Sequence, residues 1–365
     1  MKLLTAVSMV SVFSPRATRA RGADWVELSV LIEGRPMTNG RIISAQRILS
    51  EPGDDLEIID QDDLDDGIGI DFDNDPSVSD NVSEEKCQLI LEELESRSQL
   101  LGDLYPFSIV SKNSGWSLEM KERISPEISG AHKCYLACLL MTCARSELLN
   151  FDRTSSVVQG IGNAFQALAY ISAAELLGGK AFWMGFPRPD RSNMLDAVRN
   201  LSDQMGLGIP VDQRPPSVGS TNSVKDGGID LIAWRTFKDG RPSGIVLYGQ
   251  VASGDDWQEK SVNGNIGKFK AFFKSAPAAH PLIAIFIPRV ANDGIGEDNV
   301  YSYEDRVSAS ISSLDGELGL IVDRLRLTEL TGQFGRSASY EYKDIQYCIR
   351  KIVEWSVKAI KQARE

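Results

Sequence analysis

Two polar side chains that could share a cation lie at the ends of adjacent β-branched runs in the middle of the chain. Asp230 opens the run 229–234, and Gln250 lies near the end of the run 245–251. The polar loop between them, residues 238–242, contains glycine and proline, which is typical of a β-hairpin. Because neighbouring strand ends meet at one edge of a sheet, we expect both side chains to converge there. Oxygen ligands of this kind hold hard cations such as Mg²⁺.

This pattern resembles the PD-(D/E)XK superfamily, which includes restriction endonucleases and many bacterial defence nucleases. Its members carry an acid early on one strand and acid-x-lysine or glutamine-x-lysine on the next. Asp230 matches the first position and Gln250 the second, whereas Ala252 stands where the lysine belongs. The resemblance implies Mg²⁺ or Mn²⁺ held by Asp230, Gln250 and the main-chain carbonyl of Val251. A metal there would activate water for the hydrolysis of phosphodiesters.

The resemblance implies two further site residues. Gln166 lies in an apolar segment where many relatives place a glutamate that faces the metal, and a neutral amide binds Mg²⁺ more weakly. Lys260 is the nearest downstream lysine that could replace the missing one, ahead of Lys225 and Lys268. Each residue also has a structural interpretation: a strand-start acid at Asp230, polar residues at a strand end or on an apolar helix for the glutamines, and solvent-exposed lysines.

The surrounding pattern predicts the elements that would position these residues. We expect the following elements after residue 155: a helix at 157–177, a strand at 181–186, a helix at 193–205, the hairpin, a basic helix at 263–275, a strand at 281–287, and helices at 303–330 and 340–364. When the helix expected at 193–205 is set aside, the elements from 157 to 287 follow the α-β-β-β-α-β order of the family. The expected fold is therefore α/β, with a restriction-endonuclease-like αβββαβ core in residues 155–365 and C-terminal helices.

Residues 1–150 are predicted to form an α+β accessory domain with its own core. Alternating residues indicate a strand at 25–33, and helical spacing indicates helices at 41–49, 83–101 and 132–149. His132 is interpreted as a structural histidine. Motifs for other chemistries, such as a nucleophile elbow or a phosphate-binding glycine loop, are absent from the sequence.

A strongly acidic segment interrupts this first part. Fifteen of the 35 residues from 51 to 85 are Asp or Glu and none is Lys or Arg, so a chain of net charge −12 is slightly basic elsewhere. Such blocks are usually solvated and disordered, which is our interpretation. A sharper alternative is an electrostatic decoy that keeps nucleic acid away from a basic groove.

Cysteine usage and the N-terminus indicate the compartment. Five cysteines without a CxxC pair, together with only two histidines, predict free buried thiols in a reducing cytoplasm and no zinc site. The apolar run 1–13 is followed by arginines rather than by small residues, and it is too short to span a membrane. We expect a cytoplasmic protein without a membrane partner, with secretion as the minor alternative.

These observations lead to a first functional hypothesis and two alternatives. The first is a metal-dependent DNA endonuclease that acts in a bacterial anti-phage defence system. The PD-(D/E)XK resemblance implies the endonuclease. Residues 249–254 with Trp257 are also similar to uncharacterised bacterial phage-defence proteins, which implies the defence role and further defence-system partners. Lys268, Lys270 and Lys274, and a second basic segment at 351–364, would contact phosphates. The alternatives are a catalytically inactive nuclease-fold subunit that binds DNA or a partner protein, and a scaffold whose acidic segment binds a basic partner.

Overall fold

The computed structural model describes most of the chain. The described residues are 17–50, 76–112, 115–122, 130–146, 148–213, 228–239, 241, 243–297, 300–332 and 342–364. The apolar run 1–13, residues 51–75 of the acidic segment, and Lys225 lie outside them.

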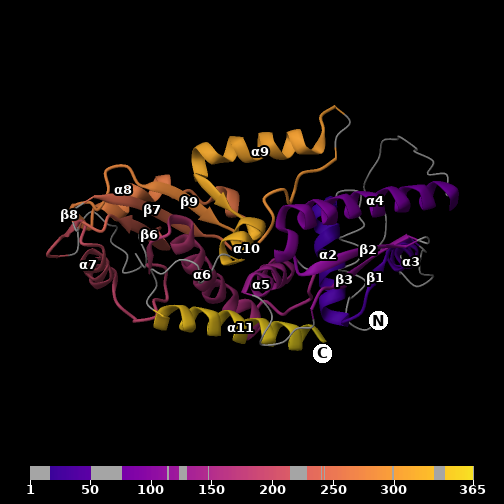
Figure 1. The fold of residues 1–365 in the computed structure, drawn as a ribbon, viewed down its shortest axis with the longest axis horizontal. Coiled ribbons are helices and arrows are strands. Elements are labelled where there is room, and N and C mark those ends of the chain that lie inside the picture. Colours follow the sequence, from indigo (N-terminus) through magenta and orange to yellow (C-terminus); the bar gives the residue numbers. More distant parts are fainter. Residues whose placement is uncertain are drawn as a thin grey trace, which may run out of the picture.

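A five-stranded mixed sheet, here called the central sheet, lies in the left half of the molecule as drawn in Figure 1, with the strand order β10-β9-β7-β6-β4. Its strands are β4 (Lys180–Trp183), β6 (Leu231–Thr236), β7 (Gly244–Val251), β9 (Leu282–Phe286) and β10 (Leu320–Val322). Strands β7, β9 and β10 are parallel, whereas β6 is antiparallel to both β4 and β7. The carboxyl ends of β4, β7, β9 and β10 therefore lie at the same edge as the start of β6, here called the carboxyl edge. The fold is mixed α/β, as predicted.

Helices cover both faces of this sheet. Helix α6 (Ser156–Leu177) packs on β4, β6 and β7 from one side. Apolar side chains of α7 (Met194–Met205) and α8 (Asn263–Lys270) join a core cluster with alternate residues of β6 and β7 on the other side. Helix α9 (Tyr303–Leu318) packs on β9 and β10. The result is a three-layer α/β arrangement.

The sequence explains why α6 forms and where it ends. The Ser155 side chain accepts a hydrogen bond from the Val158 N–H, which caps the start, and Gly178 closes the end with a left-handed φ of 58°. The next residue, Gly179, enters β4 so closely that a Cβ there would lie 2.0 Å from the Trp234 carbonyl oxygen, so only glycine fits. Because α6 is packed between the sheet and α11 (Tyr342–Arg364), it is apolar on nearly all sides, as predicted.

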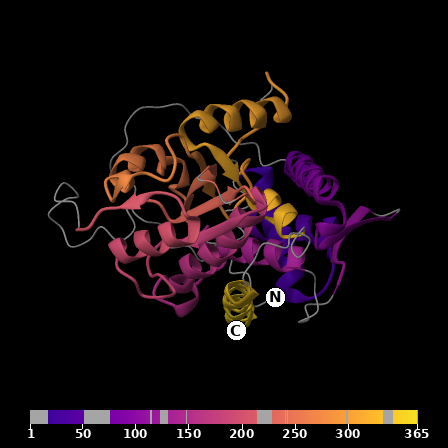
Figure 2. The ribbon, with the colours of Figure 1, turned by 60° about the vertical axis from the view of Figure 1, so that its left-hand side comes forward.

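Most of the remaining elements extend from the α6 side of the sheet, whereas β5 (Ile209–Pro210) and β8 (Phe273–Ser275) lie beside α7 and α8 (Figures 1 and 2). The remaining helices are α2 (Arg19–Glu33), α3 (Asn39–Ser50), α4 (Pro76–Leu101), α5 (Gly130–Arg145), α10 (Arg324–Gly332) and α11 (Tyr342–Arg364), with short 3₁₀ turns at Gly102–Leu104 and Trp257–Glu259. The remaining strands are β1 (Met37–Thr38), β2 (Phe107–Lys112) and β3 (Gly115–Met120) in one antiparallel sheet, and β5 (Ile209–Pro210) with β8 (Phe273–Ser275) in another.

The predicted accessory domain does not have a core of its own. One cluster of buried side chains contains residues of α2, α4 and α5 together with residues of α6, the central sheet and α11. Helix α5 packs on α10, α11 and α6, so helices from both predicted domains enclose the same apolar interior. The expectation of a separate core in residues 1–150 is therefore wrong, and the boundary near residue 150 stays a prediction.

The strand predicted at 25–33 is wrong, because these residues belong to helix α2. Every residue from Ala20 to Ile32 except Arg21 is buried, including the charged Asp24 and Glu27. A helix buried on all sides does not show the one-sided apolar stripe that identifies amphipathic helices. The alternation of residues at 25–33 arises by chance, and it wrongly indicated a strand.

Three other predictions need correction. Residues 76–85, expected to be disordered, begin α4, whose later turns bury Cys87, Ile90 and Leu94 against the core. The helix expected at 263–275 ends at Lys270, and its last residues form β8. Strand β10 was not predicted, because three residues are too few for a periodic pattern and the strand depends on its pairing with β9.

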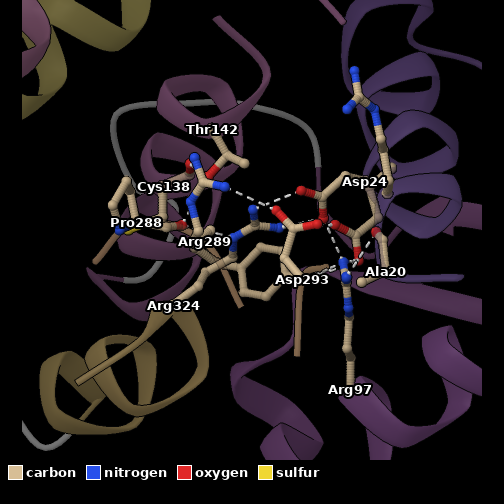
Figure 3. A network of polar contacts seen from close by, with 12 residues as sticks. Ala20, Asp24, Arg97, Cys138, Thr142, Pro288, Arg289, Asp293 and Arg324 are labelled. Carbon is tan, nitrogen blue, oxygen red and sulfur yellow. Dashed lines mark hydrogen bonds and ion pairs between the residues drawn. The ribbon is translucent and has the colours of Figure 1, made fainter. Parts of the chain in front are cut away.

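A buried ionic network joins α2, α4 and α10 (Figure 3). Both Asp24 carboxylate oxygens accept hydrogen bonds from Arg324, at 2.7 and 2.8 Å, and Arg97 donates to Asp24 at 2.7 Å. Glu27 accepts from the hydroxyls of Tyr105 and Tyr135, each at 2.7 Å. Since Arg324 is fully buried, these contacts compensate its desolvation.

Two predictions about the cysteines and histidines are confirmed. All five cysteines are buried and free of disulfides. The buried His132 has its Nε2 2.9 Å from the Asp103 carbonyl oxygen, in line with a structural role. No helix in the described ranges combines the length and apolar character needed to cross a membrane.

Candidate metal site at the carboxyl edge

Asp230 is held in place by hydrogen bonds from three elements. Its N–H donates to the Gly249 carbonyl of β7 at 2.9 Å. Its carbonyl accepts from the N–H groups of Met184 and Gly185, which follow β4, at 2.9 and 2.6 Å. It also accepts from Gln166 Nε2 of α6 at 2.8 Å. A residue fixed in this way offers its carboxylate in a preorganised position.

The Asp230 carboxylate lies close to Gly185 and to the Gln166 side chain. Its Oδ2 accepts a hydrogen bond from the Val251 N–H at 2.8 Å. A Cβ built on Gly185 would lie 3.2 Å from Asp230 Oδ1 and 2.8 Å from Gln166 Oε1. Both oxygens therefore lie close to Gly185, and a side chain at position 185 would crowd them.

Gln250 contributes an oxygen that has no hydrogen-bond partner. The β6–β7 register pairs Leu231 with Gly249, so Gln250 is the residue opposite Asp230 at the next position along the ladder. Gln250 Oε1 is buried, and among the described residues it has no hydrogen-bond partner. A buried acceptor without a partner is costly and indicates an unfilled interaction.

These oxygens are of the type that binds a hard cation, although only one of them is a carboxylate oxygen. Asp230 Oδ1 and the amide oxygens of Gln166 and Gln250 are the side-chain donors at this edge, and the Val251 carbonyl is the implied main-chain donor. In the described part of the chain, no three His, Cys, Asp or Glu side chains come together as a metal site. Any cation here would depend on neutral oxygens, which predicts weak binding.

Ala252 stands at the position of the missing lysine and Lys260 is the expected replacement for that lysine, and both residues make contacts outside the candidate metal site. Ala252 is fully buried in a small core cluster with Ile285 and Ile321, and its N–H donates to the Phe286 carbonyl at 2.9 Å. Lys260 Nζ lies 3.3 Å from Asp256 Oδ1, and both side chains are partly exposed. The structure therefore brings Asp230, Gln166 and Val251 into contact and places Gln250 opposite Asp230, whereas Lys260 forms its own ion pair.

The glycine before Asp230 has a structural explanation. Gly228 has a φ of 77°, and a Cβ on it would lie 2.2 Å from Asn265 Cγ of α8. Glycine is thus required to let the chain turn into β6 against α8. Its presence does not by itself indicate catalysis.

The lysines predicted to contact DNA lie on the α8 side of the sheet. Lys268, Lys270 and Lys274 each have a neighbour: Asn265 Oδ1 at 3.2 Å, the Ala279 carbonyl at 2.9 Å and Asp212 Oδ2 at 2.7 Å, respectively. The second basic segment, 351–364, belongs to α11, which packs on α6 at the opposite side of the sheet. The two segments therefore do not form one continuous basic surface.

The sequence patterns missed a group of arginines at this edge. Arg21, Arg145, Arg153 and Arg289 line one cavity although they come from three widely separated parts of the chain, Arg145 and Arg153 from the same one. No spacing rule connects these three parts, so only the tertiary structure reveals the group.

Comparison with known proteins adds no relative. No family model, no curated protein and no solved structure matches this chain.

Proposed function

We propose that this chain is a metal-dependent nuclease that cleaves DNA, with Asp230 as its principal metal ligand. One observation carries the proposal: Asp230 has its main chain held by α6, the β4 end and β7 and its carboxylate held by the Val251 N–H, and it lies opposite Gln250, whose buried oxygen has no partner among the described residues. The order α6, β4, β6, β7, α8, β9 supports it, because it agrees with the order expected from the family resemblance once α7 and the short strands are set aside.

The roles of the residues follow from their positions. Asp230 and Gln250 would hold Mg²⁺ or Mn²⁺, with Gln166 and the Val251 carbonyl as weaker ligands. The bound cation would lower the pKa of a water molecule and stabilise charge on the phosphate. Gly185 allows the close approach of Asp230 and Gln166, because a side chain at position 185 would crowd both residues. The phage-defence role and its partner proteins rest on the sequence similarity alone.

A catalytically inactive DNA-binding or partner-binding subunit is the second candidate, and two observations favour it. The site has a single carboxylate, and the buried Ala252 provides no charge at the lysine position. Both candidates predict DNA or partner binding, and only the first predicts cleavage.

The test is cleavage of plasmid DNA by the purified chain with Mg²⁺, with Mn²⁺, and with EDTA. We expect nicked and linear products with either metal and none with EDTA, because phosphodiester hydrolysis at this site needs the cation. A gel-shift assay on the same DNA separates the candidates. Binding without cleavage under all metal conditions would support the inactive subunit and contradict the nuclease.

Restoring a second carboxylate should strengthen metal binding. We expect Gln250→Glu to bind Mn²⁺ on the order of tenfold more tightly than the wild type, since affinity for hard cations rises with the number of charged oxygen ligands. Isothermal titration calorimetry measures this directly. Gln159→Glu, on the exposed surface of α6, makes the same chemical change away from the site and should have no effect. Equal affinities in all three proteins would place the metal elsewhere.

A further inference from the structure

A polar cavity of about 550 Å³ lies at the carboxyl edge of the sheet. It is enclosed by the start of α2, the end of α5, and the segments that follow β7 and β9. Ligands of open α/β sheets bind beyond the carboxyl ends of parallel strands, and a cavity of this size accommodates a small molecule. Its lining does not include Asp230, Gln250 or Gln166, so the inference does not depend on the proposed metal site.

Guanidinium groups dominate the charge of this cavity. Four arginines line it: Arg21, Arg145, Arg153 and Arg289. Three acids also line it, but the Asp24 carboxylate is already bound by Arg324 and Arg97 (Figure 3). Burial raises the pKa of Asp293, against the effect of Arg289. The net excess of positive charge favours an anion.

Arg289 provides a second, independent observation that favours a ligand in this cavity. The residue is 8 % exposed, and its Nη1 lies 3.1 Å from Asp293 Oδ2, while Nη2 contacts Asp255. Its Nε is buried and has no hydrogen-bond partner among the described residues. The main chain holds it in place, because the Arg324 N–H donates to its carbonyl at 3.0 Å. An unused donor on a buried cation that lines a cavity points to an anionic ligand.

We propose that this cavity binds a nucleotide through its phosphate groups. Arginine recognises phosphate by paired, charge-assisted hydrogen bonds, and arginines from separate segments can surround more than one phosphate. The partly exposed Ile295 also lines the cavity and supplies apolar surface for a base, beside the buried Leu148 and Trp257. A mononucleotide with two or three phosphates fits the volume and the sign of the charge, whereas a continuous nucleic-acid strand would have to place its phosphates into a cavity of limited size.

The test is calorimetric titration of the full chain with ATP, in EDTA so that the metal site does not contribute. We expect Arg145→Ala and Arg153→Ala each to weaken binding about tenfold or more, because each removes a charged donor to phosphate. Both residues are exposed, so these variants should remain folded. Asp255→Asn should tighten binding several-fold, because it removes an acid that competes for Arg289.

Matched controls identify the site. Arg241→Ala removes an exposed arginine at the opposite edge of the sheet and should bind ATP like the wild type, as should Asp230→Ala. No ATP binding at millimolar concentration, or binding that is equal in all variants, would overturn the proposal. A short DNA duplex whose binding is lost in the arginine variants, while ATP does not bind, would instead assign the cavity to nucleic-acid phosphates and would also overturn it.

Discussion

Asp24→Ala is expected to lower the free energy of unfolding by about 3–5 kcal/mol, as found when one partner of a buried ion pair is removed. Asp24 binds Arg324 through both oxygens and also binds Arg97. Its removal leaves the fully buried Arg324 without a carboxylate that accepts its hydrogen bonds. Because domains of this kind are stable by about 5–15 kcal/mol, the variant should unfold at a much lower urea concentration.

Asp212→Ala is the matched control for this effect. Asp212 Oδ2 lies 2.7 Å from Lys274 Nζ, the same separation as between Asp24 and Arg324, but the Asp212 side chain is 82 % exposed. An exposed pair contributes very little to stability, since water solvates both partners when the pair is broken. Similar urea midpoints for the two variants would show that the network around Asp24 is not what stabilises the packing of α2, α4 and α10.

The pKa of Asp24 predicts how the stability difference between the wild type and Asp24→Ala depends on pH. Burial alone would raise this pKa, but Arg324 and Arg97 outweigh burial and hold it below its ordinary value of 3.8. A carboxyl with a lowered pKa contributes stability above its unfolded pKa and loses it as the pH falls through the folded pKa. The wild type should therefore lose more stability than Asp24→Ala as the pH is lowered through the range below about 4. Unfolding curves measured across this range test the sign.

Asp230→Ala is expected to lower the rate of metal-dependent DNA cleavage by more than about a hundredfold, which exceeds the 10–100-fold loss typical of residues that only orient metal ligands. The variant removes the only carboxylate among the proposed ligands. It should remain folded, because the side chain accepts one described hydrogen bond, from the Val251 N–H, worth about 1 kcal/mol. Single-turnover cleavage of plasmid DNA measures the loss.

Asp239→Ala serves as the control for Asp230→Ala. Asp239 is an exposed acid in the hairpin turn, at the edge of the sheet opposite the candidate site. Its removal should leave cleavage unchanged. If Asp230→Ala cleaves DNA as fast as Asp239→Ala while both remain folded, the metal lies elsewhere and Asp230 only supports the start of β6.

The local residue pattern was sufficient to predict the elements that have a clear apolar periodicity or clear start and end signals. The hairpin, α6, α7 and α11 were predicted from apolar periodicity, from the glycines at 178–179 and from the β-branched runs. The hairpin register also explains why Asp230 and Gln250 were expected together. Antiparallel neighbours close in sequence meet whenever the hairpin forms, whatever the rest of the chain does.

Elements and sites that depend on distant partners were not visible in the sequence. Helix α2 was missed because it is buried on all sides, and β10 because its three residues are a strand only beside β9.

The sequence by itself determined the mixed α/β character, the hairpin and the placement of Asp230 at its first strand, because these depend on contacts between near neighbours in the chain. Only the tertiary structure decided the shared core, the ionic network at Asp24 and the four-arginine cavity. These join residues up to 300 positions apart. The reason is physical: a charged side chain is buried only where tertiary packing places its partner beside it. The local sequence pattern does not contain this information.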